Sequence, residues 1–185
     1  MIRRVVTGHK GGKAVFVADG RPQRHHVFKH NPGVEAAVAW SEPALPSITS
    51  DSHAESVSAA TTIVPPQGET RLVFLKVPPM SWAQEPDFDP AAAGQEMFAA
   101  MPDIAATFEA DGATHRTDSI DYVIVLDGEV HLVLDDEEVL LKERDVVVQA
   151  GTRHAWRNST DRPAMLAVVL IGAQREDIEP EPTDR

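Results

Sequence analysis

The sequence contains no cysteine, so neither disulfide bonds nor thiolate chemistry contributes to its fold or its function. Long apolar runs are also missing. The longest lies around Ala164 to Gly172, far below the roughly 20 residues that a membrane-spanning helix needs. The N-terminus lacks the apolar stretch of a signal peptide. We therefore expect the 185 residues to form one cytoplasmic domain that has no membrane partner.

Positive charge is scarce. The chain has 17 Lys and Arg against 29 Asp and Glu, a formal net charge of −12. Such a surface repels nucleic-acid backbones, so we expect no nucleic-acid partner. The cations concentrate in residues 1–30, which hold seven Lys or Arg and only one acid, Asp19. This segment is interpreted either as a solvated arm or as an arm that lies across an acidic partner subunit.

The sequence also lacks the glycine-rich loops that cradle phosphates and the Gly-x-Ser-x-Gly turn of a hydrolase. What it has instead is a series of short β-rich segments separated by turn residues. A hairpin is expected at 3–7 and 13–18, followed by strands at 34–40, 71–77, 120–126, 130–134, 138–141, 145–149, 154–157 and 164–171. This pattern predicts an all-β barrel or sandwich.

A helical insertion is expected at about 80–113. Asp89 followed by Pro90 is typical of a helix start, and the alanine-rich run to Met101 favours helix. A second short helix is expected from Pro102. The two helices share an apolar stripe that must be buried, made of Met97, Phe98, Met101, Ile104 and Phe108. We expect this stripe to pack on the barrel exterior; the alternative is a lid at the barrel mouth.

Two motifs in the last third of the chain are the most specific features of the sequence. The first reads His115-x-Thr117, three residues, Asp121, six residues, Gly128, and the second reads Gln149-x-Gly151-x-x-His154-x-x-x-Asn158. Together they resemble the paired motifs of the cupin superfamily. Those motifs run His-x-His, a spacer, Glu, six residues and Gly, and later Pro-x-Gly-x-x-His-x-x-x-Asn.

The motifs depart from the usual cupin pattern at four positions. Thr117 stands in place of the second histidine, and Asp121 in place of the glutamate. In the second motif Gln149 occupies the usual proline position, and Arg144 replaces the glycine that normally precedes it. The resemblance implies a single cupin barrel, a jelly roll or double-stranded β-helix, over 31–175. An N-terminal strand arm at 1–30 would precede it and a disordered acidic tail at 176–185 would follow.

The resemblance also implies a metal site made of His115, Asp121 and His154. Two histidines and one carboxylate leave open positions on a divalent ion such as Fe, Zn, Mn or Ni. The alternative is a degenerate cupin in which the histidines are hydrogen-bonded without a metal. Every second residue of the strand that begins at Asp121 points to the same side as Asp121, which is the barrel interior in cupins. The expected substrate pocket is lined by Thr117, Val123, Val125, Trp156, Met97 and Met101.

Two functions agree with these features. The first is a small metal-dependent enzyme that acts on an apolar or aromatic small molecule, as a dioxygenase, decarboxylase or isomerase. The second is a non-catalytic cupin that binds a small molecule without metal. Cupins commonly pair through their sheets, and an isolated hairpin is marginal in water, so a homodimer is expected.

Overall fold

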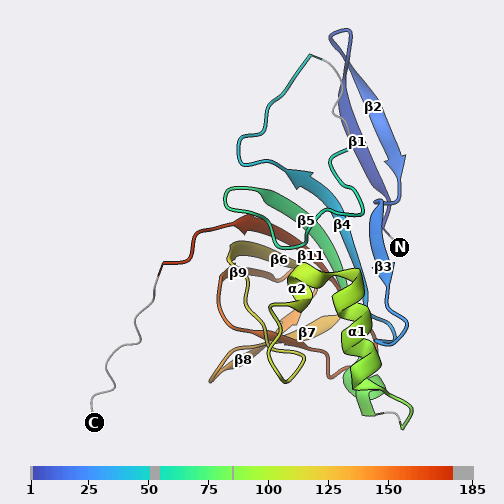
Figure 1. The fold of residues 1–185 in the computed structure, drawn as a ribbon, viewed down its shortest axis with the longest axis vertical. Coiled ribbons are helices and arrows are strands. Elements are labelled where there is room, and N and C mark those ends of the chain that lie inside the picture. Colours follow the sequence, from blue (N-terminus) through green and yellow to red (C-terminus); the bar gives the residue numbers. More distant parts are fainter. Residues whose placement is uncertain (1, 51–54, 85, 177–185) are drawn as a thin grey trace.

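The computed structural model of the chain describes residues 2–50, 55–84 and 86–176, and its architecture is shown in Figure 1. The largest sheet is antiparallel, with the strand order β3 (Arg24–Val27), β4 (Glu35–Glu42), β5 (Thr70–Val77), β11 (Ala164–Gly172), β6 (Ser119–Asp127) and β9 (Val146–Ala150). A three-stranded sheet has the order β10 (Ala155–Arg157), β7 (Glu129–Val133) and β8 (Glu138–Lys142). The inner faces of these two sheets meet in one hydrophobic core.

Strand β6 shows how sequence alternation produces this arrangement. Ser119, Asp121, Val123 and Val125 are buried, whereas the residues between them are less buried or exposed. The side chains of a strand point alternately to its two faces, so these four residues face the barrel interior. The strand therefore carries apolar core residues at one end and polar residues at the other.

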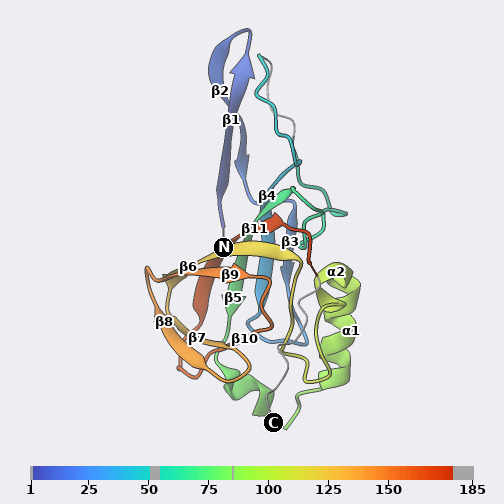
Figure 2. The ribbon, with the colours of Figure 1, turned by 90° about the vertical axis from the view of Figure 1, so that its left-hand side faces the viewer.

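The N-terminal hairpin consists of β1 (Arg4–Lys10) and β2 (Lys13–Gly20), which pair only with each other among the described strands. Gly11 and Gly12 have φ values of 57° and 74°, the left-handed conformation that a tight hairpin turn requires. Figures 1 and 2 show this hairpin projecting from one end of the barrel. The hairpin expected from the sequence is confirmed.

The helical insertion contains a 3-10 helix, η1 (Met80–Gln84), followed by α1 (Pro90–Ala100) and α2 (Pro102–Ala105). Asp89 caps α1: its side chain accepts hydrogen bonds from the backbone N–H groups of Ala91 and Ala92, at 2.9 and 3.1 Å. Figure 2 shows both α-helices on one side of the barrel. None of the described helices is long and apolar enough to cross a bilayer.

The all-β barrel with an N-terminal hairpin and a short helical insertion is therefore confirmed, and every expected strand is present with small differences at its ends. Most of the acidic tail predicted at 176–185 lies outside the described residues, which end at 176.

The turn between β8 and β9 contains the only non-glycine residue in the described chain with a positive φ, Arg144 at 77°. Its backbone N–H donates to the carbonyl of Val125 at 2.8 Å, so the turn is fixed against the barrel. A Cβ atom makes this conformation costly. We expect Arg144→Gly to raise the free energy of unfolding by about 1 kcal/mol.

Urea denaturation measures this change. Glu143→Gly is the matched control, because Glu143 is the exposed neighbour and does not have a positive φ. In Glu143→Gly the glycine relieves no strain and adds only the entropy cost of a more flexible backbone. Its free energy of unfolding should therefore fall by up to about 1 kcal/mol. A loss of stability in Arg144→Gly would contradict the strained-turn explanation.

Candidate functional site

A cavity of about 570 Å³ lies between the barrel strands and the helical insertion. This size is typical of small-molecule sites. The barrel lines it with apolar groups that include Val123 and Trp156. The insertion lines it with the stripe formed by Met97, Phe98, Met101, Ile104 and Phe108. The expectation that this stripe packs on the barrel exterior is wrong, because its residues form one wall of the cavity. The lid alternative stays a prediction.

The structure brings nearly all of the predicted site residues to this cavity. The lining includes His115, Thr117, Asp121, Val123, His154, Trp156, Met97 and Met101. Val125 is absent from the described lining. Val125 lies two residues beyond Val123 on β6 and points to the same face. There it is buried in the hydrophobic core.

A chain of hydrogen bonds runs along the inner face that leads into β6. The hydroxyls of Thr117 and Ser119 are 2.8 Å apart, and the Ser119 hydroxyl donates to Oδ1 of Asp121 at 2.6 Å. All three side chains are buried. Burial raises the pKa of the Asp121 carboxyl, and the hydrogen bond from Ser119 opposes this rise only in part. The site thus holds a carboxyl whose neutral form is favoured relative to a carboxyl in water.

His115 and His154 form a pair that lines the same cavity as this carboxyl. Each backbone N–H donates to the other residue's carbonyl at 2.9 Å, and the two ring centroids are 4.3 Å apart. Phe108 contacts the His115 ring with a centroid distance of 4.5 Å, and Trp156 meets the His154 ring edge-on at 5.7 Å. The imidazoles therefore lie in a largely aromatic surrounding.

Both imidazoles are held in their neutral form. Burial and, to a smaller extent, the neighbouring His115 lower the pKa of His154 to about 4. Burial also lowers the pKa of His115. The Nδ1 atoms lie 3.1 Å from the carbonyl oxygen of Ala113 in His115 and 2.9 Å from that of Thr152 in His154. These contacts favour a proton on Nδ1, which leaves each Nε2 with a free lone pair.

This donor set fits a divalent metal only in part. A neutral imidazole whose Nδ1–H is bound by a carbonyl is the usual form of a ligating histidine. Within the described residues, however, no group of three or more His, Asp or Glu side chains is placed to hold a metal ion. Oδ1 of Asp121 is instead bound to Ser119. The predicted three-residue centre is therefore not assembled, and we derive no reaction step through a metal.

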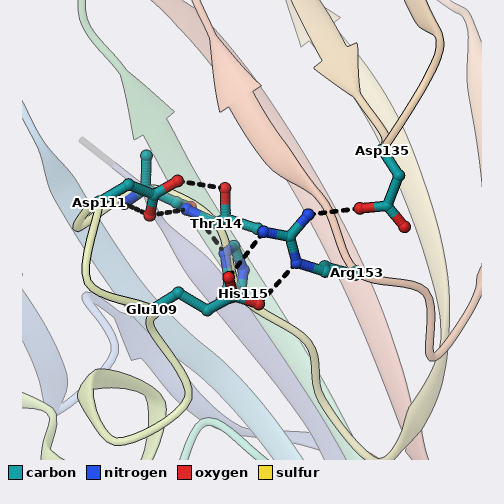
Figure 3. Close-up of polar contacts among 7 residues, drawn as sticks. Glu109, Asp111, Thr114, His115, Asp135 and Arg153 are labelled. Carbon is teal, nitrogen blue, oxygen red and sulfur yellow. Dashed lines mark hydrogen bonds and ion pairs between the residues drawn. The ribbon is translucent and has the colours of Figure 1, made fainter.

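An ion cluster centred on Arg153 lies near His115, as Figure 3 shows. Nε and Nη2 of Arg153 donate to the carboxylate of Glu109, both at 2.6 Å, and its Nη1 donates to Asp135. Glu109 belongs to the insertion and Asp135 to the turn between β7 and β8. These partners raise the pKa of Arg153 above its ordinary value. Arg153 thus ties the end of the insertion to the barrel, next to His154.

The adjoining turn carries a second polar cluster. Oδ1 of Asp111 accepts from the backbone N–H groups of Ala113 and Thr114 at 3.0 and 2.8 Å, and the Thr114 hydroxyl donates to Oδ2. The Thr114 hydroxyl and the two N–H groups lower the pKa of Asp111 to about 2. The turn is thereby held in the conformation that presents His115 to the cavity.

Two buried polar residues of the site were missed from the sequence. Ser119 shares the parity of Thr117 and Asp121, which could have placed it on the same face. Gln149 is a lone polar residue after three valines in β9, and it is buried in the cavity wall. A polar residue that interrupts an apolar inward face is the signal that could have identified it.

Comparison with known proteins identifies the segment that carries these residues. Residues 107–170 match the sequence profile of the cupin domain family. The phomopsin biosynthesis cluster protein C' of Diaporthe leptostromiformis is 64% identical over 66 residues, which is 35% of this chain and 34% of that protein. The cupin-domain-containing oxidoreductase virC of Hypocrea virens is 39% identical over 61 residues, 31% of each chain. The chain thus spans about a third of the length of these curated relatives.

Similar solved structures also include cupins. A cupin superfamily protein from Desulfitobacterium hafniense has a TM-score of 0.40 and 8% identity, and the similarity covers 79% of this chain and 84% of that one. A cupin 2 conserved barrel domain protein from Salinispora arenicola has a TM-score of 0.35 and 17% identity, with 60% and 68% covered.

Proposed function

Because this chain carries a cupin domain over residues 107–170, we propose that it is a cupin-type enzyme that acts on an apolar or aromatic small molecule inside the barrel. The observation that carries the proposal is the pair of neutral imidazoles, His115 and His154, which share an aromatic-lined cavity with the buried Asp121 carboxyl. Titratable groups with shifted pKa values in an apolar pocket are typical of active sites.

The residues present are suited to proton transfer next to a carbonyl group. The Nε2 atom of neutral His154 would accept a proton from a carbon beside the carbonyl of the substrate. The carboxyl of Asp121, whose pKa burial raises, would in its protonated form donate that proton to the carbonyl oxygen, which produces an enol. In a substrate with a C=C bond one carbon further along, this enol is a dienol. His154 would return the proton to the far carbon of that C=C bond while the hydroxyl proton returns to Asp121. The C=C bond is then next to the carbonyl group, which completes an isomerisation. Trp156 and Phe108 would exclude water from this exchange.

The named relatives support the enzyme class. Two of them are described as cupin-domain-containing oxidoreductases, virC and fogC, and three others as proteins of phomopsin or oryzine biosynthesis clusters. These names place the relatives in biosynthesis, and an apolar cavity of 570 Å³ has a size typical of small-molecule sites. The proposed substrate is therefore an intermediate of small-molecule biosynthesis with an apolar or aromatic body.

A metal-dependent form of this enzyme is favoured by one specific observation, the free Nε2 lone pairs of His115 and His154. An Fe, Zn, Mn or Ni ion held by these two atoms would supply a Lewis acid for a substrate oxygen. Elemental analysis of untagged protein would support this form if near-stoichiometric metal is lost in His154→Ala. Absence of metal after reloading would contradict it and leave the proton-transfer form.

Deuterium exchange tests the proposed proton transfer. The probe is 2-tetralone, an aromatic ketone with acidic C–H groups, followed by proton NMR in D2O. We expect the wild-type protein to accelerate exchange at C1, and His154→Gln and Asp121→Asn to lose at least about tenfold of that acceleration. Binding of 2-tetralone without accelerated exchange would contradict catalysis and favour the non-catalytic small-molecule-binding alternative.

The homodimer expected from the sequence stays a proposal. What supports it is the hairpin β1–β2, which has no further strand partner among the described residues and exposes Phe16 and Val5. A second copy that adds its hairpin or sheet edge would bury these side chains.

A further inference from the structure

We propose that Gln149 selects the substrate by binding a planar neutral group that both donates and accepts hydrogen bonds, such as a primary carboxamide. The inference deepens the proposed function, because it names the chemistry of a ligand in the same cavity, and it rests on that proposal. It concerns recognition alone and assigns Gln149 no part in the proton transfer.

The Gln149 amide has no hydrogen-bond partner among the described residues. Its side chain is only 4% exposed, and both Nε2 and Oε1 are buried without a donor or acceptor within reach. Buried side-chain amides in folded proteins are nearly always hydrogen-bonded. Because Gln149 lines the cavity, the molecule that occupies the cavity is the available partner.

The position of Gln149 in the sheet aims it at the reacting groups. It lies on β9 directly opposite Asp121 of β6, and paired residues of neighbouring strands place their side chains on the same face. A ligand bound to the Gln149 amide is thereby placed beside the Asp121 carboxyl. An anionic ligand group would also lose its hydration in this buried site, so a neutral amide is preferred to a carboxylate.

Packing does not explain a glutamine at this position. The preceding residues of the strand, Val146 to Val148, are apolar, and a leucine would fill a similar volume without the cost of burying an unpaired amide. The amide therefore destabilises the free protein and gains its partners only on ligand binding. Sites built in this way reject analogues that lack the matching polar group.

Three probes of similar shape separate hydrogen bonding to Gln149 from apolar contact with the cavity: 2-naphthamide, 2-acetylnaphthalene and 2-isopropylnaphthalene. The first donates and accepts, the second only accepts, and the third does neither. We expect the wild-type protein to bind the amide at least about tenfold more tightly than the hydrocarbon, measured by calorimetry, with the ketone between them. In Gln149→Leu this order should disappear, and the melting temperature should stay unchanged or rise.

Gln67→Leu is the matched control, because Gln67 is exposed and lies outside the cavity lining; its probe affinities should equal those of wild type. Equal wild-type affinities for the three probes, or a preference that survives in Gln149→Leu, would overturn the role of Gln149 and leave the cavity intact. A drop in melting temperature of Gln149→Leu would show that the amide is structural and would also overturn it. Failure of the wild type to bind any probe would overturn both this inference and the proposed substrate class.

Discussion

His154→Gln is expected to remove much of the pH dependence of stability between pH 5 and pH 7. The folded protein holds the pKa of His154 at about 4, below the ordinary value of 6.5. The unfolded chain therefore binds more protons in this window, and wild-type stability falls as the pH is lowered from 7 to 5. His154 accounts for a loss of about 2 kcal/mol in the free energy of unfolding between pH 7 and pH 5. A glutamine does not titrate, so the variant should not show this loss.

Urea denaturation of the chelator-treated protein at pH 7 and pH 5 measures this difference. His115 acts in the same direction as His154, and Asp121, whose pKa is raised, acts in the opposite direction near its own titration range. Both groups are present in wild type and variant, so their effects largely cancel in the comparison. His30→Gln is the control, because His30 is exposed. If His154→Gln kept the wild-type pH dependence, His154 would not be buried as a neutral group.

Gly172→Ala is expected to destabilise the folded protein severely. A Cβ on Gly172 would lie 1.9 Å from the carbonyl oxygen of Pro66 and 2.8 Å from that of Pro65. These backbone atoms have little room to move, because Gly172 accepts from the N–H of Gly68 at 2.8 Å and donates to the carbonyl of Glu69 at 2.9 Å. The loss of unfolding free energy should exceed about 3 kcal/mol.

Gly94→Ala provides the matched control for this prediction. Gly94 lies inside α1, and a Cβ there would meet no atom within 4 Å. Alanine favours helix over glycine, so this variant should gain up to about 1 kcal/mol by urea or thermal denaturation. A Gly172→Ala variant as stable as wild type would show that the loop at 65–69 does not pack against the end of β11.

The strands could be predicted because their evidence is local. Alternation in β6 and the turn residues around Gly128 indicate both the strand and its inward face, and the structure has Asp121 and Val123 buried and Tyr122 exposed. Arg153 and Arg157 alternate with His154 and Trp156, and both arginines pair with carboxylates, those of Glu109 and Glu138. The cap at Asp89 likewise depends only on neighbouring residues.

Features that depend on distant contacts were not accessible from the sequence. The stripe of Met97 and Phe108 shows that one helix face is buried, but not that it closes a cavity. The position of Gln149 opposite Asp121 follows from the pairing of β9 with β6, and its amide has no partner among the described residues. Motif spacing also does not reveal whether three donors converge, and here Asp121 bonds to Ser119 instead of completing a set with the histidines.

We propose that the small molecule binds in the cavity beside His115 and His154. The proposed function depends above all on binding at this place. The most direct measurement is the proton NMR spectrum of the histidine rings during titration with 2-tetralone. We predict that the ring signals of His115 and His154 shift together with saturation, while those of His9 and His131, which do not line the cavity, stay in place. Saturating shifts confined to other histidines, or no shift at any ring, would contradict binding in this cavity.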